Sequence, residues 1–375
     1  MAATAMQMES LGRIPISFMY KIVAINLGSS STKFAYYEDD RCVFKTNIEH
    51  SNELLRKYPN VWDQFDFRRE DILATMKQQG IKIPELAAIV TRGGHTVPLP
   101  GWVYRINELM LEQSASGKYG VHATDLGLKM ASMFSAEGPV PLTVDPPVTD
   151  EFEPLARYAG LKEIQRHSSF HALNHRSTAK LHAKTIGRDY DKLNLIGVHM
   201  GGGISVCCHK QGKMVDATNG LVGDGPFSTN RTGTIPASAL VKLCFSGTYT
   251  QETLMQKLNN AGLFSYLGES DVKTVIGMIE SGDKNAEEVL MAMCYQIGKE
   301  TAAMSAVLKG RVDGIYITGG IAFSELVTDW IKERVEHLAP VYLYPGEHEM
   351  ESLALGAYDA LRGIRPMQEL KLPND

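Results

Sequence analysis

Short apolar runs alternate with longer amphipathic segments along the whole chain, a pattern typical of alternating strands and helices. In the first half it predicts strands at 21–26, 33–38 and 42–48, helices near 51–57 and 68–79, a buried strand at 86–90, a helix at 123–136, a strand at 140–144, and helices at 150–158 and 171–186. Only short polar turns separate the first three strands, so we expect them to pair as antiparallel neighbours.

The second half repeats that order. It predicts strands at 194–199, 203–209 and 213–217, helices near 236–246, 250–259 and 270–281, a long helix at 284–309, a strand at 312–318, a helix at 323–337, a strand at 341–344 and a last helix at 349–362. In the long helix, Val289, Met293 and Ile297 recur at the spacing of a buried face. The repeat predicts an α/β fold with two related domains, each a mixed sheet flanked by helices, around a shared cleft.

We place the first domain at 19–189 and the second at 190–375, with the last helix able to pack back on the first domain. A length of 375 residues and an apolar fraction of 44% are consistent with two cores. Residues 1–18 are expected to be a poorly ordered extension, because Arg13 and Pro15 interrupt any signal-peptide core.

Charge and cysteine content narrow the possible partners and the compartment. The net charge is −5, which gives no reason to expect nucleic acid as a partner, and no apolar stretch reaches the ~20 residues that a membrane span needs. The cysteines (Cys42, Cys207, Cys208, Cys244 and Cys294) form no C-x-x-C pair. They are expected to be free thiols in a reducing cytoplasm.

In each half, one turn rich in small residues follows the first strand. The first turn contains Asn26, Gly28, Ser29, Ser30, Ser31 and Lys33, and the second contains His199, Gly201, Gly202 and Gly203. Glycine allows close backbone approach, and serine, backbone N–H groups and lysine suit a polyphosphate. Each turn alone could be an ordinary hairpin loop, but the repetition favours a nucleotide clamped between two domains.

Other candidate residues stand at the ends of predicted strands or in glycine-rich loops. Arg92 and Arg231 suit phosphoryl or carboxylate oxygens, with surface ion pairs as the alternative. Asp145 precedes two prolines and suits a water-mediated Mg²⁺ contact, or a simple turn. His171 and His175 are four residues apart, hence on one helical face, but lack the H-E-x-x-H pattern of a zinc site.

Several of these segments together resemble the acetokinase family, and most closely its butyrate kinase branch. The motifs are Asn26–Lys33, Phe170–His175, His199–Gly203, Gly225–Gly233, Leu240–Gly247 and Tyr344–Glu347, and they extend over about residues 20–365. The family belongs to the sugar kinase, Hsp70 and actin superfamily. The resemblance therefore implies two duplicated ribonuclease-H-like domains with an interdomain cleft that closes over ATP.

The resemblance also implies a reaction: reversible, Mg²⁺-dependent transfer of phosphate between ATP and a short-chain carboxylate, by direct in-line displacement. It assigns Arg92, His122 and Arg231 to the acid and the developing phosphoryl charge, and His171 to the transition state. It assigns the two small-residue turns, with Gly319, Gly320 and Ile321, to the nucleotide. Asp145 is expected to hold Mg²⁺ together with Glu349, which we favour over Glu347 and Glu351. The family further implies a homodimer or larger assembly.

The chain departs from the family pattern around the expected acid pocket. His95 and Thr96 stand where apolar residues are usual, Asp125 replaces an asparagine, and His348 stands where an aspartate is common. These changes leave open whether butyrate, acetate, propionate or a branched-chain acid is preferred. The alternatives from other classes are a non-catalytic actin-like or Hsp70-like nucleotide-binding protein and an exopolyphosphatase-like hydrolase.

Overall fold

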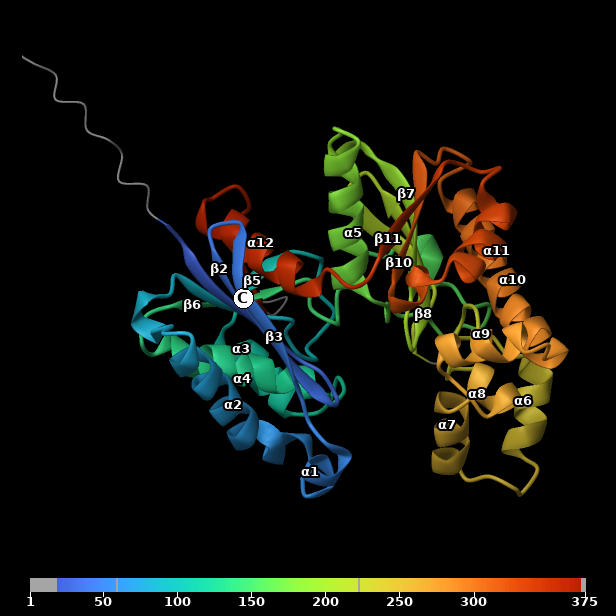
Figure 1. The fold of residues 1–375 in the computed structure, drawn as a ribbon, viewed down its shortest axis with the longest axis horizontal. Helices are drawn as coiled ribbons and strands as arrows, with labels where there is room; N and C mark the ends of the chain where they lie inside the picture. The colour runs from blue at the N-terminus through green and yellow to red at the C-terminus, as the bar shows by residue number, and fades with distance from the viewer. Residues whose placement is uncertain (1–18, 59, 222, 372–375) are drawn as a thin grey trace, which may run out of the picture.

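The computed structural model describes residues 19–371 except residues 59 and 222. It contains two β-sheets that lie side by side, each with its own helices (Figure 1). The expected extension at residues 1–18 lies outside the described residues.

The first sheet has seven strands in the order β12-β5-β6-β4-β1-β2-β3. Their bounds are β1 Lys21–Leu27, β2 Ser31–Glu38, β3 Arg41–Glu49, β4 Ala88–Thr91, β5 Val103–Arg105, β6 Val140–Val144 and β12 Gln368–Glu369. β1 pairs antiparallel with β2 and parallel with β4. β4 continues in parallel with β6, so the carboxyl ends of β1, β4 and β6 share one edge of the sheet.

Both faces of β1 are buried, because helices cover the first sheet on both sides. Val23 and Ile25 face the core shared with α2 (Phe65–Gln78) and α4 (Ala123–Ser135). Ile22 and Ala24 face α12 (Glu349–Leu361), so the last long helix packs on the first sheet (Figure 1). The first unit also contains α1 Asn52–Arg56 and α3 Glu108–Ala115.

The second sheet has five strands in the order β11-β10-β7-β8-β9. Their bounds are β7 Asn194–Met200, β8 Ile204–Lys210, β9 Lys213–Ala217, β10 Gly314–Gly319 and β11 Val341–Pro345. The helices of this unit are α5 Ala172–Thr185, α6 Ala237–Cys244, α7 Gln251–Asn259, α8 Leu263–Leu267, α9 Val272–Glu280, α10 Lys284–Val307 and α11 Glu325–Val335. Helix α10 lies against β7 and β8, and α5 packs on β7 and β10.

The two sheets share one plan, which confirms the predicted fold. Each begins with a three-stranded antiparallel meander, β1-β2-β3 and β7-β8-β9. Each then adds a parallel strand beside its first strand, β4 beside β1 and β10 beside β7. The mixed sheets flanked by helices are those of a duplicated ribonuclease-H-like fold.

Some local predictions fail. The helix expected at 150–158 is wrong: only a 3₁₀ turn, Pro154–Arg157, forms there. Asp150 instead accepts hydrogen bonds from the backbone N–H of Phe152 and from Arg157, which holds the segment in a turn. The sequence pattern also misses β5, α3, α8 and β12, which are short. Within the described part of the chain, no helix combines the length and apolarity that crossing a bilayer requires.

Candidate active site

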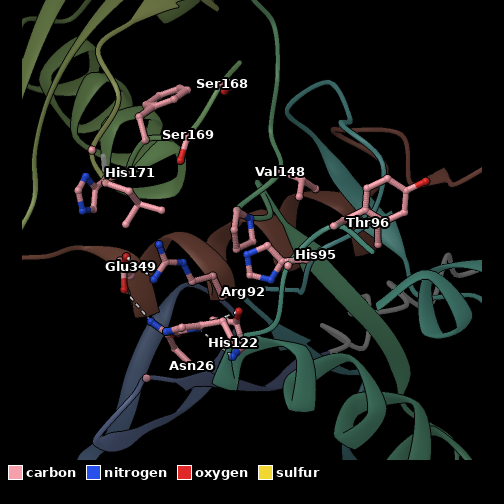
Figure 2. A pocket seen from close by; sticks show the side chains of 18 of the residues that line it. Asn26, Arg92, His95, Thr96, His122, Val148, Ser168, Ser169, His171 and Glu349 are labelled. Atoms are coloured by element: carbon pink, nitrogen blue, oxygen red, sulfur yellow. Dashed lines mark hydrogen bonds and ion pairs between the residues drawn. The ribbon is translucent and has the colours of Figure 1, made fainter. Parts of the chain in front are cut away.

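A cavity of about 780 Å³ lies between the two units, beside the carboxyl ends of β1 and β4. Much of the predicted site lines it: Asn26, Ser31, Lys33, Arg92, His122, His171 and Glu349. Figure 2 shows Asn26, Arg92 and Glu349 close together on one side, with His171 opposite them. Segments more than 300 residues apart in the chain therefore meet at one polar cavity.

A buried arginine holds the first small-residue turn in place. The Arg68 side chain, from α2, donates to the backbone carbonyls of Ser31 at 3.0 Å and Ser29 at 3.1 Å. It is fully buried, and burial lowers its pKa to about 10. The sequence reasoning missed Arg68, because an arginine within a polar helical segment looks like a surface residue.

Charged side chains lie close together at the N-terminal end of α12. Glu349 Oε2 accepts from Asn26 Nδ2 at 2.6 Å, and its other oxygen lies 3.5 Å from Arg92 Nη1. Lys33 pairs with Glu347 at 2.6 Å. Burial alone would raise the pKa of Glu349, but the positive charges of Arg92 and Lys33 hold it below its usual value. Glu349 is thus a buried carboxylate kept ionised by its neighbours.

His122 begins α4 and connects that helix to the first turn. Its Nδ1 accepts from the backbone N–H of Thr124 at 3.2 Å, which leaves Nε2 as the donor to Ser29 Oγ at 3.0 Å. Burial and the nearby charge of Arg92 lower the pKa of His122, so the ring is neutral. Beside it, the carboxylate of Asp125 pairs with His95, 3.2 Å from His95 Nδ1.

The opposite wall of the cavity carries neutral histidines. His171 stacks on His199 with ring centroids 4.0 Å apart, and its Nδ1 lies 3.0 Å from Ser205 Oγ. His199 Nδ1 is 3.1 Å from Asn174 Oδ1. Burial holds the pKa of both His171 and His199 well below the usual range. The positive charges of Arg92 and Arg231 lower the pKa of His171 further, and the charge of Glu349 acts in the opposite direction.

The other predicted site residues are outside the described lining of the cavity, although Ser29 contacts His122 and His199 stacks on His171. They are Ser29, Ser30, Asp145, His199, Gly201, Gly202, Gly203, Arg231, Gly319, Gly320 and Ile321. Asp145 directly follows β6 and is buried in an ion pair with Arg176, 2.9 Å from Oδ1 to Nε. Arg231 Nη1 donates to the carbonyl of Asn259 at 2.8 Å, and burial lowers the pKa of Arg231.

The glycine turns of the second unit depend on close backbone approach. A Cβ on Gly319 would lie 2.3 Å from the carbonyl oxygen of Met200, and Gly319 has a φ of +94°. A Cβ on Gly203 would lie 2.2 Å from the carbonyl oxygen of Gly220. Glycine is thus required where β10 ends beside β7 and where the second small-residue turn meets the loop that follows β9.

Comparison with known proteins fits this geometry. The family model described as the acetokinase family matches residues 155–342. The chain is 46% identical to a protein named probable butyrate kinase from Clostridium botulinum Eklund 17B, over 92% of this chain and 98% of the relative. A protein of the same name from C. botulinum Alaska E43 is 45% identical over the same shares. The chain belongs to the acetokinase family.

Solved structures agree with this family at the level of the fold. Acetate kinase from Porphyromonas gingivalis superposes with a TM-score of 0.75 at 17% identity, covering 92% of this chain and 100% of that one. A propionate kinase from Francisella tularensis gives a TM-score of 0.68 at 19% identity, covering 90% and 99%. The two-sheet architecture is therefore shared with acetokinase structures of low sequence identity.

Proposed function

We propose that this protein is a carboxylate kinase that transfers the γ-phosphoryl group of ATP reversibly to a short-chain carboxylic acid, with butyrate preferred. The observation that carries this proposal is one cavity in which Arg92 and Lys33 face His171 across a space of about 780 Å³. That volume accommodates a polyphosphate tail and a small acid together. The name of the relatives that are 45–46% identical supports butyrate as the acid.

The proposed chemistry needs positive charge and alignment more than a strong base. A carboxylate is already a nucleophile, but it must approach an anionic phosphate. Arg92 offers a planar pair of donors on one wall, and a neutral His171 donates a hydrogen bond without a charge on the other. Arg231 and His122 are proposed to bind the acid and the phosphoryl oxygens when the two units close.

The nucleotide is proposed to lie along both small-residue turns. Ser29, Ser30, Ser31 and Lys33 from the first unit, and His199, Gly201, Gly202 and Gly203 from the second, are proposed to contact phosphates. Gly319, Gly320 and Ile321 are proposed to lie against the adenine. Arg68 supports this use of the first turn, because it occupies the carbonyls of Ser29 and Ser31 and leaves the N–H and hydroxyl groups for an anion.

Asn26 and Glu349, which meet at the N-terminal end of α12, offer oxygen atoms suited to a magnesium ion. Asn26 Oδ1 is buried without a hydrogen-bond partner, and it lies beside the ionised carboxylate of Glu349. Carboxylate and amide oxygens are ligands suited to Mg²⁺. We propose that Glu349 and Asn26 hold the ion, which when bound would neutralise phosphate charge. Asp145 is proposed to contribute only through water, because Arg176 already occupies Oδ1.

We also propose finer properties that follow from the packing and the family. The contacts of α5 and α12 suggest a second domain that begins near α5 and a first domain that includes α12. Cys207, Cys208 and Cys294 are free and buried, which suits a reducing cytoplasm. A homodimer is proposed from family membership.

An acyl-hydroxamate assay with C2 to C5 acids, ATP and Mg²⁺ tests this function. We expect hydroxamate with several acids, because one methylene changes the transition-state binding of an acid by only ~1–3 kcal/mol. Among these acids, we expect butyrate to give the highest kcat/KM. The highest value with acetate or propionate would reassign the substrate. ATP hydrolysis without hydroxamate would point to a hydrolase, and neither product would point to a non-catalytic nucleotide-binding protein.

Arg231→Ala tests the proposed closure of the two units. We expect a loss in kcat/KM on the order of 10³-fold, although Arg231 stands outside the described lining of the open cavity. Near-normal turnover of this variant would remove Arg231 from the mechanism.

A further inference from the structure

Behind His171, a chain of buried hydroxyls and imidazoles runs away from the cavity through the second unit. Its members are His171, Ser205, His175, Tyr316, His209 and Tyr190. Consecutive members lie 3.0, 2.9, 3.1, 2.7 and 2.9 Å apart, all within hydrogen-bonding distance. We call these six residues the relay. It connects η4 (Tyr190–Lys192), β8, β10 and α5.

The relay needs space within the second sheet, and a neighbouring strand supplies it by having no side chain at one position. At Gly197 in β7, a Cβ would lie 2.1 Å from Tyr316 Oη. Only glycine leaves room for the hydroxyl at this position, which explains a glycine inside an apolar strand. Ser205, His175, His209 and Tyr316 are all fully buried. A buried polar chain of this length is stable only when each member finds its partner.

The same region could instead be considered a metal site, because ligand atoms of His175, Cys207 and His209 lie within 4.8 Å of one another. Both ring nitrogens of His175 already have oxygen partners, Ser205 Oγ and Tyr316 Oη. Both nitrogens of His209 do as well, with Tyr190 and Tyr316. Hydrogen bonds therefore account for these imidazoles without an ion.

Each relay histidine is neutral, so each carries one N–H donor and one acceptor nitrogen. Burial lowers the pKa of His171 and His175 well below the usual range and that of His209 to about 3. Burial also raises the pKa of Tyr316 well above its usual value, so its hydroxyl keeps its proton. Under these conditions, the direction of one hydrogen bond fixes the direction of the next.

The far end of the relay sets the direction. Burial raises the pKa of Tyr190, so its hydroxyl keeps its proton, and its partner in the structure is His209 Nδ1 at 2.9 Å. We therefore take Tyr190 as the donor, which leaves His209 Nε2–H to donate to Tyr316 Oη. Tyr316 can then donate to His175 Nδ1 or to the backbone carbonyl of His175 at 2.9 Å. That carbonyl lies inside α5, where a helical N–H already supplies a donor. The ring nitrogen therefore has the greater need of the Tyr316 proton.

The same order of donors and acceptors continues toward the cavity. When Tyr316 donates to His175 Nδ1, the proton of the neutral His175 ring is on Nε2. That nitrogen lies 2.9 Å from Ser205 Oγ. Ser205 Oγ accepts from that nitrogen and donates to His171 Nδ1.

We infer that Tyr316, His175 and Ser205 are positioning residues that keep the proton of His171 on Nε2, the nitrogen left for the cavity. No proton moves along the relay; its polarity alone decides whether His171 offers a donor or a lone pair to the transferred phosphoryl group. This inference rests on the proposed kinase function for its effect on rate, but not for the tautomer itself. With the opposite polarity, Nε2 would be a nucleophile able to form a phosphohistidine.

The test compares Tyr316→Phe with Tyr344→Phe in the full-length protein. Tyr344 is a matched control, because its hydroxyl lies 2.9 Å from Nδ1 of His182, another histidine on α5 that is outside the relay. Proton–nitrogen correlation spectra of ¹⁵N-histidine-labelled protein at pH 7.5 report the tautomer of His171. The hydroxamate assay reports kcat and KM separately.

We expect His171 protonated on Nε2 in the wild type, and a shift toward Nδ1 in Tyr316→Phe. The kcat of this variant should fall on the order of 10²-fold, the effect of losing one transition-state donor, with little change in KM for ATP or acid. Tyr344→Phe should change neither. If Tyr316→Phe does not fold, Ser205→Ala takes its place with the same expectation.

Two results would overturn the inference: His171 protonated on Nδ1 in the wild type, or an unchanged tautomer and kcat in Tyr316→Phe. Failure of the kinase function is distinguishable from either. A wild type that makes no hydroxamate refutes the proposed function, while the spectra still report the relay.

Discussion

The two walls of the cavity handle charge in opposite ways. On the first unit, Lys33, Arg92 and Glu349 are ionised and lie close to one another. On the second unit, the half-buried His171 and the buried His199 are stacked and neutral. In the proposed mechanism, the positive charge that attracts the two anions is thus kept apart from the neutral donors that orient the phosphoryl group.

This difference in charge limits electrostatic repulsion between the two walls when no ligand is bound. Cations on both walls would repel each other in the absence of ligand, while neutral donors held by hydrogen bonds add no such repulsion and need no reorganisation during the reaction. Arg231 is the exception on the second unit, and its guanidinium is held by the carbonyl of Asn259 rather than by an anion. The comparison predicts large effects from charge changes on the first wall and smaller ones from changes that only support it.

Arg92→Ala should have the largest effect. Removing the cation that faces His171 is expected to lower kcat/KM by about 10³-fold or more, roughly 4 kcal/mol of transition-state stabilisation. Steady-state hydroxamate kinetics measure it. Arg69→Ala, which removes a paired arginine on α2 that does not line the cavity, should leave the rate unchanged. Equal losses in both variants would contradict a special role for the first wall.

Glu349→Gln should come next, with an effect on magnesium rather than on the acid. We expect about a 10²-fold lower apparent affinity for Mg²⁺, because the variant loses the ionised oxygen beside Asn26 Oδ1. Titration of activity with Mg²⁺ at saturating ATP measures this. Glu351→Gln, on the same helix but more than half exposed, is the matched control and should behave as wild type. A larger effect from Glu351 would move the metal to that residue.

Arg68→Met should destabilise the first turn without touching the chemistry. The variant leaves the carbonyls of Ser29 and Ser31 without their donor, at a cost of about 1–3 kcal/mol. The KM for ATP should rise while kcat changes little, and urea unfolding should shift to lower concentration. An unchanged KM for ATP would show that the turn keeps its shape without Arg68.

Falling pH should destabilise the fold through the buried histidines of the second unit. The folded pKa values of His171, His175, His199 and His209 are lowered, so below pH 6.5 the unfolded chain binds protons that the folded chain excludes. Stability is therefore complete above pH 6.5 and falls as pH decreases, approaching about 1.4 kcal/mol per pH unit for each such histidine. Urea midpoints between pH 5 and 8 measure the slope. A flat profile would mean that these rings take up protons as readily in the folded protein as in the unfolded chain.

The sequence predicts the fold and much of the cavity because both leave local signals. Strand β1 is a continuous apolar run, and the turn from Asn26 to Lys33 is recognisable in the sequence by its glycine and serine residues. Glu349 lines the cavity, as does Glu347, and the preference for Glu349 as a magnesium ligand came only from the resemblance and stays a prediction. Arg68, Ser205 and Tyr316 carry no such signal, since their roles depend on partners that are distant in the chain. The helix expected at 150–158 fails because Asp150 makes a local turn that competes with the helix.

We propose direct phosphoryl transfer from ATP to the acid within one cleft, with His171 as a hydrogen-bond donor and not as a nucleophile. The most direct test is the stereochemical course at phosphorus, measured with ATP made chiral at the γ-position by oxygen isotopes and butyrate as acceptor. A single in-line displacement predicts inversion of configuration in the acyl phosphate. Retention would mean two displacements through a phosphorylated side chain, and it would contradict both the direct transfer and the assigned tautomer of His171.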